Sequence, residues 1–231
     1  MMSDWRSFWD SEHSIYVNAR HKDVHYREIA DQIAAFVPSP SVRVLDYGSG
    51  DAIHADHVAA VAAELMLCDS APSVRASMAA RFAGNPRIKV ISPEEVAALP
   101  DRRLDLIVTN SVAQYLTEDE LKRLLAMFRR LLAPGGTLIF ADVIPPDVGA
   151  ISDVSALIRY AAKHGFLIAA LVGLAKTTVS PYRKIRNTLG IAQYTQEQFM
   201  RKLTDAGFSA ERLARNMEHN PARMTFRAKP V

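Results

Sequence analysis

Residues 42–52 read VRVLDYGSGDA and decide how the rest of the chain is interpreted. Val42, Val44 and Leu45 give a short apolar run of the kind that makes a buried strand. Gly48 and Gly50 then permit a sharp turn, because glycine tolerates positive φ and leaves the backbone open to a ligand. Helical spacing follows over residues 51–63. The stretch therefore predicts a strand, a glycine turn and a helix whose N-terminal N–H groups can meet a ligand.

Two acidic residues accompany this turn. Asp46 closes the first strand, where a carboxylate would repel a pyrophosphate but would suit a cationic amine. Asp69 follows the second predicted strand, 64–68, and lies 19 residues beyond Gly50. An acid at about this spacing can accept hydrogen bonds from both ribose hydroxyls. The third glycine of a dinucleotide site is missing, with Ala52 near its place, and this absence and Asp46 beside the turn argue against NAD.

The pattern DxGxGxA over residues 46–52 resembles motif I of the class I S-adenosylmethionine (SAM)-dependent methyltransferases. Two further segments are similar to that family. LDLIVTN at 104–110 resembles its fourth strand, and APGGTLIFAD at 133–142 resembles the joint between its fourth helix and fifth strand. The resemblance covers roughly residues 40–145 and, more weakly, 195–231. It implies an α/β fold: a Rossmann-like, doubly wound, seven-stranded, mostly parallel sheet with an antiparallel last strand, plus a helical cap.

The resemblance also implies a function, namely methyl transfer from SAM to a small-molecule or lipid-like acceptor. In that family the glycine turn meets the methionine part of SAM, and the segment after the third strand faces the adenine. The adenine contact stays open between Glu94, Glu95 and the backbone around Val96. The positions implied to bind the cofactor are Asp46, Gly48, Ser49, Gly50, Asp69, Ser70, Glu95, Val96, Asn110 and Ser111.

The chain divides into four predicted parts. Residues 1–40 form a helical cap, with helix expected over 4–36, and the SAM-binding core follows. A helical lid or insertion comes next, and a helix with an antiparallel strand pair, expected over 209–215 and 224–229, completes the sheet. The boundaries of the last three parts are 41–144, 145–194 and 195–231.

No catalytic residue is assigned, because a methyl group on a sulfonium is already activated and needs no fixed triad. The protein must align the reactants, exclude water and, where needed, remove a proton. Side chains able to do this are frequent in the front section. The candidates are Tyr16, His21, His25 and Tyr115, with His164 and His219 as further possible bases.

A metal site is not predicted. His54 and His57 lie one turn apart on the helix after the glycine turn, with Asp51 and Asp56 nearby. Without further ligands, an exposed helix face is the better interpretation. The single Cys68 excludes a disulfide framework and a cysteine zinc site.

The chain has 231 residues and a formal charge of +3, from 28 basic and 25 acidic residues, which is too balanced to argue for nucleic acid. The uncharged run 166–175 is too short to span a bilayer. It is expected to be a buried lid helix, or alternatively part of a peripheral membrane contact through 165–186. The expected location is the cytoplasm, and the oligomeric state, monomer or homodimer, stays open. The alternative functions are an NAD-dependent oxidoreductase on the same fold and a non-catalytic SAM-binding protein.

Overall fold

The computed structural model describes residues 16–177 and 191–231, and the structural statements below concern those residues. Seven strands form one sheet in the order β3-β2-β1-β4-β5-β7-β6. All are parallel except β7, which runs antiparallel to both β5 and β6. The predicted fold is therefore confirmed. The strands are β1 Arg43–Tyr47, β2 Glu64–Cys68, β3 Ile88–Ile91, β4 Leu104–Asn110, β5 Leu132–Val143, β6 Phe208–Arg212 and β7 Met224–Pro230.

The strand order reverses between β1 and β4. From β1 the chain runs outward to β2 and β3, and then crosses to the other side of β1 as β4. Asp46 of β1 pairs with Leu67 of β2 on one side and Val108 of β4 on the other. In open α/β sheets a ligand binds beyond the carboxyl ends of the strands at such a reversal. The glycine turn after β1 lies at this point.

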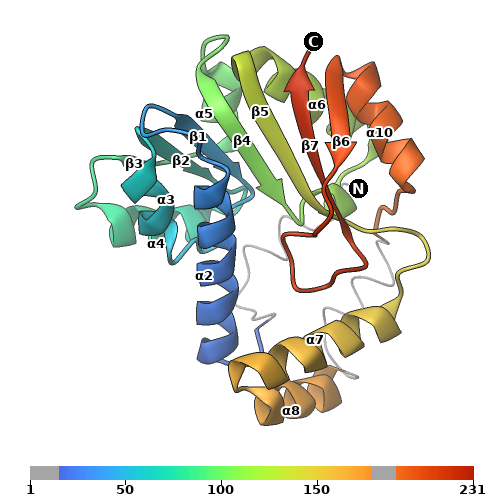
Figure 1. The fold of residues 1–231 in the computed structure, drawn as a ribbon. Coiled ribbons are helices and arrows are strands. Elements are labelled where there is room, and N and C mark those ends of the chain that lie inside the picture. The colour runs from blue at the N-terminus through green and yellow to red at the C-terminus, as the bar shows by residue number, and fades with distance from the viewer. Residues whose placement is uncertain (1–15, 178–190) are drawn as a thin grey trace.

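Helices cover both faces of the sheet (Figure 1). Three of them begin with capping boxes, at Ser92, Thr117 and Thr195, which satisfy N-terminal N–H groups. The helices are α2 Ala19–Ala35, α3 Ala55–Val61, α4 Pro72–Phe82, α5 Pro93–Ala98, α6 Glu118–Leu131, α7 Ala150–His164, α8 Leu167–Thr177 and α10 Gln196–Asp205, with a short 3-10 helix η1 at Ala113–Tyr115.

Two hydrophobic cores lie on the two faces of the sheet. Successive side chains of β5 point to opposite faces of the sheet, so Phe140 belongs to one core and Ile139 to the other. The Phe140 core packs against α6 and α10, through residues such as Phe128 and Phe199. The Ile139 core packs against α2, α3 and α4, with Met78 among its buried residues.

A third, smaller cluster joins α2 to α7 and α8, away from the sheet (Figure 1). Val24 of α2 packs there with Tyr160, Ala161, Phe166 and Ala170. The far end of α2 lies against the Ile139 core. One helix therefore connects the sheet to the helical pair of the insertion. The expected domain boundaries stay predictions, and residues 1–15 of the cap and 178–190 of the lid lie outside the described residues.

The structure corrects four local expectations. The helix after the glycine turn begins at Ala55 rather than at residue 51, because Gly50 and Ala52 have positive φ, +57° and +41°, which a right-handed helix cannot use. Residues 16–18 are bends, and Asn18 caps α2. The double glycine at 135–136 lies inside β5 instead of in a separate turn. The strand expected over 209–215 ends at residue 212.

Candidate functional site

The glycine turn after β1 is closely packed. Gly48 and Gly50 have φ of +80° and +57°. A Cβ on Gly48 would lie 2.4 Å from Val112 Cγ2, and one on Gly50 would lie 2.4 Å from the Tyr26 hydroxyl. Any larger residue would clash at either position and would be strained by its φ. Both glycines are therefore required by the fold itself, before any ligand is considered.

The N–H groups of this turn are already engaged. Gly48 and Ser49 donate to the Cys68 carbonyl at 2.7 and 3.0 Å. Gly50 N donates to Asp69 Oδ2 at 3.0 Å, and Asp51 N donates to the Tyr26 hydroxyl at 2.8 Å. The expectation of N–H groups open to a ligand is wrong for this conformation. Two of these bonds are to side chains, and the Tyr26 side chain reaches the turn from a separate helix, α2.

Asp69 lies directly after β2, as the sequence predicted. Its Oδ2 accepts from Gly50 N and its Oδ1 accepts from Ala71 N at 2.9 Å. Burial raises the pKa of this carboxyl. Each carboxylate oxygen has a second lone pair, so both remain able to accept a further hydrogen bond. The geometry is compatible with a ligand diol that bridges the two oxygens.

Asp46 is a buried acid, 7% exposed, one residue before the end of β1. Burial, aided by the charge of Asp69, raises its pKa to about 7. Within the described residues no basic side chain forms an ion pair with it. Asp46 and Asp69 lie near each other at the carboxyl edge of the sheet and repel each other. A cationic ligand bound there would offset this repulsion.

The other predicted cofactor positions differ in burial and in the hydrogen bonds that they already make. Ser49 is buried, with its hydroxyl 3.5 Å from Met78 Sδ, and Ser70 is exposed. Glu95 caps α5: its Oε2 accepts from Ser92 N at 2.7 Å. Val96 is fully buried and its N–H donates to the Ser92 carbonyl at 3.0 Å. An adenine contact through Glu95 would therefore compete with the helix cap.

Asn110 and Ser111 follow at the end of β4. Asn110 Nδ2 donates to Glu218 Oε1 at 2.8 Å, while its buried Oδ1 has no hydrogen-bond partner among the described residues. Ser111 has φ of +57° and donates to Asp142 Oδ2 at 2.7 Å. A buried acceptor without a donor is costly, so Asn110 Oδ1 is a candidate contact for a ligand N–H.

Glu218 is a functional candidate that sequence reasoning missed. It lies in the loop between β6 and β7, with its side chain 9% exposed. His25 Nδ1 and His219 Nδ1 each lie 3.4 Å from its Oε2. Burial acts to raise the pKa of Glu218, but the charges of the two histidines outweigh it and hold the pKa well below its ordinary value. The adjacent acid and histidine in this loop were the available signal.

Among the candidate bases, His25 is the best placed. Burial acts to lower its pKa, yet Glu218 outweighs burial and raises it. His21 differs: burial and its histidine neighbours lower its pKa to about 4, and it stacks on Phe166 at 4.8 Å. Burial raises the pKa of Tyr16 well above its ordinary value, so this phenol is a poor base at neutral pH. Tyr115 is half-buried in η1.

A second buried network holds the loop that carries Glu218. Arg223 contacts Asp142 at 2.6 Å and Asp153 at 2.8 Å. Asn216 Nδ2 donates to Asp142 Oδ1 at 3.0 Å. Asp142 ends the regular part of β5 and Asp153 lies on α7, so Arg223 ties the loop to the sheet and to the insertion at once.

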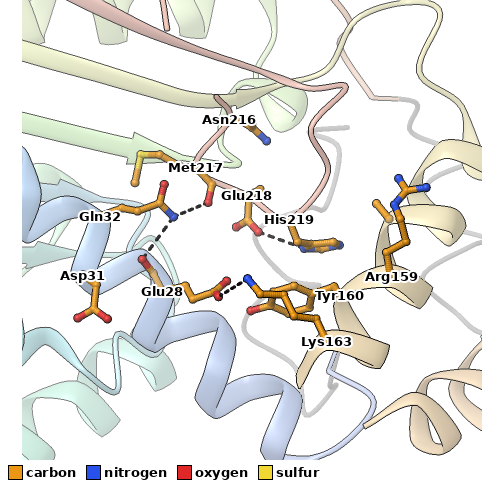
Figure 2. Close-up of a pocket in the computed structure, with 11 residues that line it drawn as sticks. Glu28, Asp31, Gln32, Arg159, Tyr160, Lys163, Asn216, Met217, Glu218 and His219 are labelled. Atoms are coloured by element: carbon orange, nitrogen blue, oxygen red, sulfur yellow. Dashed lines mark hydrogen bonds and ion pairs between the residues drawn. The ribbon is translucent and has the colours of Figure 1, made fainter. Parts of the chain in front are cut away.

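An open cavity of about 480 Å³ lies beside this loop, between α2 and α7 (Figure 2). Glu28 and Gln32 contribute from α2, and Gln32 Nε2 donates to the Met217 carbonyl at 2.7 Å. His219 stacks on Tyr160 of α7 with ring centroids 5.0 Å apart. The Glu218 and His219 side chains are thus placed between the cavity and the buried side of α2.

Comparisons with known proteins agree with this geometry. Residues 45–140 match the family model described as a methyltransferase domain. A curated relative, a probable non-canonical nonribosomal peptide synthetase, CymA, from Salinispora arenicola, is 36% identical over 106 residues. That match covers 44% of this chain but about 1% of the relative's length.

Solved structures share the fold at low identity. The DhpI–SAH complex aligns with a TM-score of 0.59 and 16% identity, over 99% of this chain and 93% of that one. Magnesium protoporphyrin IX methyltransferase from Synechocystis PCC 6803 aligns with a TM-score of 0.59 and 14% identity, over 97% and 92%. Among the described residues, no helix is long and apolar enough to cross a membrane. Residues 45–140 therefore match a methyltransferase domain by sequence, and the strand order and the glycine turn agree with the fold of class I SAM-dependent methyltransferases.

Proposed function

We propose that this chain transfers the methyl group of SAM to a small-molecule acceptor held at the carboxyl edge of the sheet, under α2 and the β6–β7 loop. One observation carries the proposal. The acids Asp46 and Asp69 beside the glycine turn and the buried pair of His25 and Glu218 meet at this same edge. Tyr26 lies between them, with its hydroxyl on the turn and its ring 5.0 Å from that of His25.

The donor side of the proposal uses three groups. When bound, SAM supplies a methyl group that its sulfonium has already activated. Asp69 accepts from the ribose hydroxyls with the lone pairs that Gly50 and Ala71 leave. Asp46 pairs with the ammonium of the methionine part, and Asn110 Oδ1 accepts from the same group. Within the described part of the chain, Asn110 Oδ1 is a buried acceptor without a donor, and Asp46 is an acid without a cation. A ligand ammonium would satisfy both groups.

The acceptor side uses His25. Its Nδ1 faces Glu218, so Nε2 is the nitrogen that would take a proton from the acceptor. A base in this role must reach the proton that it removes and hold a pKa suited to neutral pH. Glu218 stabilises the imidazolium that forms, as its effect on the His25 pKa indicates. Burial of both side chains keeps water from the reacting groups.

The names of the relatives support a small acceptor. One relative is named a probable nonribosomal peptide synthetase, and one a methyltransferase of magnesium protoporphyrin IX. The formal charge of +3 gives no reason to favour nucleic acid.

A lipid-like acceptor is a second candidate, favoured by the apolar surface of α8. Ile168 is 81% exposed, Leu171 51% and Val172 50%. A helix with such a face can lie in a membrane interface. Vesicle flotation tests this candidate: the wild type should float with vesicles, and Ile168→Glu should abolish flotation. The rest of the predicted membrane contact, 178–186, lies outside the described residues.

The main experiment separates the functions in two steps. Calorimetric titration with SAM, S-adenosylhomocysteine and NAD should show binding of the first two only. Transfer of a labelled methyl group is then measured against a panel of small phenols, amines, carboxylic acids and lipids. Glu218→Gln should retain SAM binding and lose transfer. Binding of NAD without SAM would overturn the proposal, and SAM binding without transfer to any panel member would favour a non-catalytic SAM-binding protein.

A further inference from the structure

The start of α3 carries a cluster of metal-ligating side chains that the methyl-transfer site does not use. One ligand atom from each of His54, Asp56 and His57 lies within 4.8 Å of the other two. His54 is the residue before the helix and His57 belongs to its first turn. Residues three apart share one helix face, so the two imidazoles are neighbours, with ring centroids 5.4 Å apart.

Each imidazole is already oriented by a carboxylate from α2. His54 Nε2 lies 2.8 Å from Asp23 Oδ1, and His57 Nδ1 lies 2.7 Å from Asp31 Oδ1. The ring nitrogens on the opposite sides, Nδ1 of His54 and Nε2 of His57, are those left for a metal. A histidine ligand almost always donates its second nitrogen to a carboxylate, carbonyl or water in this way, which fixes the tautomer.

The charge at the cluster suits a dication. With neutral imidazoles, Asp23, Asp31 and Asp56 bring three negative charges to one side of the α2–α3 contact. Arg27, 3.3 Å from Asp23, supplies one compensating charge. Asp56 is exposed, and among the described residues no basic side chain pairs with it. No further ligand for this cluster could be identified from the sequence. In the fold, two carboxylates of α2, Asp23 and Asp31, pair with its imidazoles.

We propose that His54, Asp56 and His57 bind a divalent transition metal of the zinc type, with Asp23 and Asp31 orienting the two imidazoles. Imidazole suits zinc, whereas magnesium and calcium prefer oxygen ligands only. Three protein ligands leave the fourth position of a tetrahedron to water. Ligand atoms of a zinc ion are about 3.4 Å apart for bonds of about 2.05 Å, which is closer than the 4.8 Å limit that holds here, so the side chains must rotate toward the metal when it binds.

The metal would fasten α2 to α3. Asp23 and Asp31 are on α2, and on the same helix Lys22 pairs with Asp51 at 2.5 Å while the Tyr26 hydroxyl accepts from Asp51 N. An occupied site would therefore steady the segment of α2 that covers the glycine turn. The proposal does not depend on the proposed function, because it concerns binding of a metal at residues outside the methyl-transfer site.

The test is titration of the tag-free, chelator-treated full chain with ZnCl2 by calorimetry. We expect one zinc per chain and a higher Tm in its presence. Asp56→Asn and His57→Ala should each weaken binding at least tenfold. Asp23→Asn, which removes an orienting group, should weaken it by about 10- to 100-fold. With CoCl2 in place of zinc, the wild type should show the intense visible bands of a low-coordinate cobalt site.

Matched controls distinguish a site from general histidine chemistry. Asp56→Asn leaves both His–Asp pairs intact, so a role limited to pairing between helices predicts no change in zinc binding. His164→Ala removes a histidine of α7 that pairs with Glu28 and should bind zinc as the wild type does. The proposal is overturned if the wild type binds no zinc, or if Asp56→Asn and His57→Ala bind it with wild-type affinity and stoichiometry.

Discussion

The donor edge and the acceptor side of this domain are built in different ways. At the donor edge the decisive contacts join near neighbours in sequence: Gly50 and Asp69 are 19 residues apart, and much of the bonding is to backbone. On the acceptor side, Asn110 meets Glu218 across 108 residues and Arg223 meets Asp142 across 81. The first region depends on one strand–turn–strand unit, and the second depends on how separate units assemble. Mutations should therefore affect the two regions differently.

The largest effect is expected from Arg223→Ala. It leaves Asp142, 1% exposed at its side chain, without its cation. Breaking a buried ion pair in this way costs about 3–5 kcal/mol. Denaturant unfolding should show this loss. The control Arg227→Ala breaks an exposed pair with Glu211, for which at most about 1 kcal/mol is expected. Equal effects of the two variants would mean that the acceptor side is not held by its buried network.

Asp46→Asn should stabilise the ligand-free protein at pH 8. The folded pKa of about 7 lies above the ordinary value of 3.8, so folding disfavours the charged form. The wild type therefore loses stability as pH rises from about 4 to about 7, and the variant does not. A shift of about three units corresponds to on the order of 4 kcal/mol as an upper value. The same variant should weaken SAM binding, and wild-type affinity should fall about tenfold from pH 8 to pH 6. Parallel pH profiles for the two proteins would contradict this.

Asp69→Ala should weaken SAM binding by about 10- to 100-fold, because hydrogen bonds to a charged group contribute about 1.5–3 kcal/mol. Calorimetric titration measures the dissociation constant for SAM. The variant also removes the acceptor for Gly50 N and Ala71 N, so circular dichroism must show an intact fold. Asp101→Ala, in the exposed turn before β4, is the control for loss of an acid. An unchanged dissociation constant for SAM would show that Asp69 does not bind the cofactor.

These outcomes bear on what could be predicted from sequence. The seven-stranded sheet with its antiparallel last strand was predicted from the resemblance over residues 40–145 and 195–231. The positions of Asp46 and Asp69 at the ends of two strands were predictable because strand pattern, glycines and acid lie within one short segment. The engaged N–H groups were not, because Tyr26, which bonds to the turn, comes from α2. Glu218 was missed for the same reason: its partners Asn110 and His25 converge only in the assembled fold. Gly48 and Gly50 were predicted as ligand contacts, and the structure adds that the fold alone requires them.

Glu218→Gln tests the acceptor side without disturbing the donor edge. Burial by itself lowers the pKa of His25, and Glu218 reverses this in the wild type. The variant should therefore move the His25 pKa from above its ordinary value to below it. Titration of histidine ring signals by NMR, with His25→Gln for assignment, reports the change. In the wild type this raised pKa adds stability at low pH that is lost as pH rises through it. If the His25 pKa does not change in this variant, Glu218 does not control the protonation of His25.

Tyr26→Phe has the smallest expected effect and tests a hydrogen bond that joins α2 to the glycine turn. The hydroxyl accepts from Asp51 N at 2.8 Å and sits 2.4 Å from where a Gly50 Cβ would be. Its loss should lower the free energy of unfolding by about 0.5–1.5 kcal/mol. If SAM uses the Asp51 N–H, the hydroxyl competes with it, so the variant should bind SAM about three- to tenfold more tightly. Tyr160→Phe removes a hydroxyl from α7 of the insertion, away from the turn, and should leave SAM affinity unchanged. Weaker binding by Tyr26→Phe would instead mean that the tyrosine stays in place and contacts the cofactor, so that α2 forms part of the donor site.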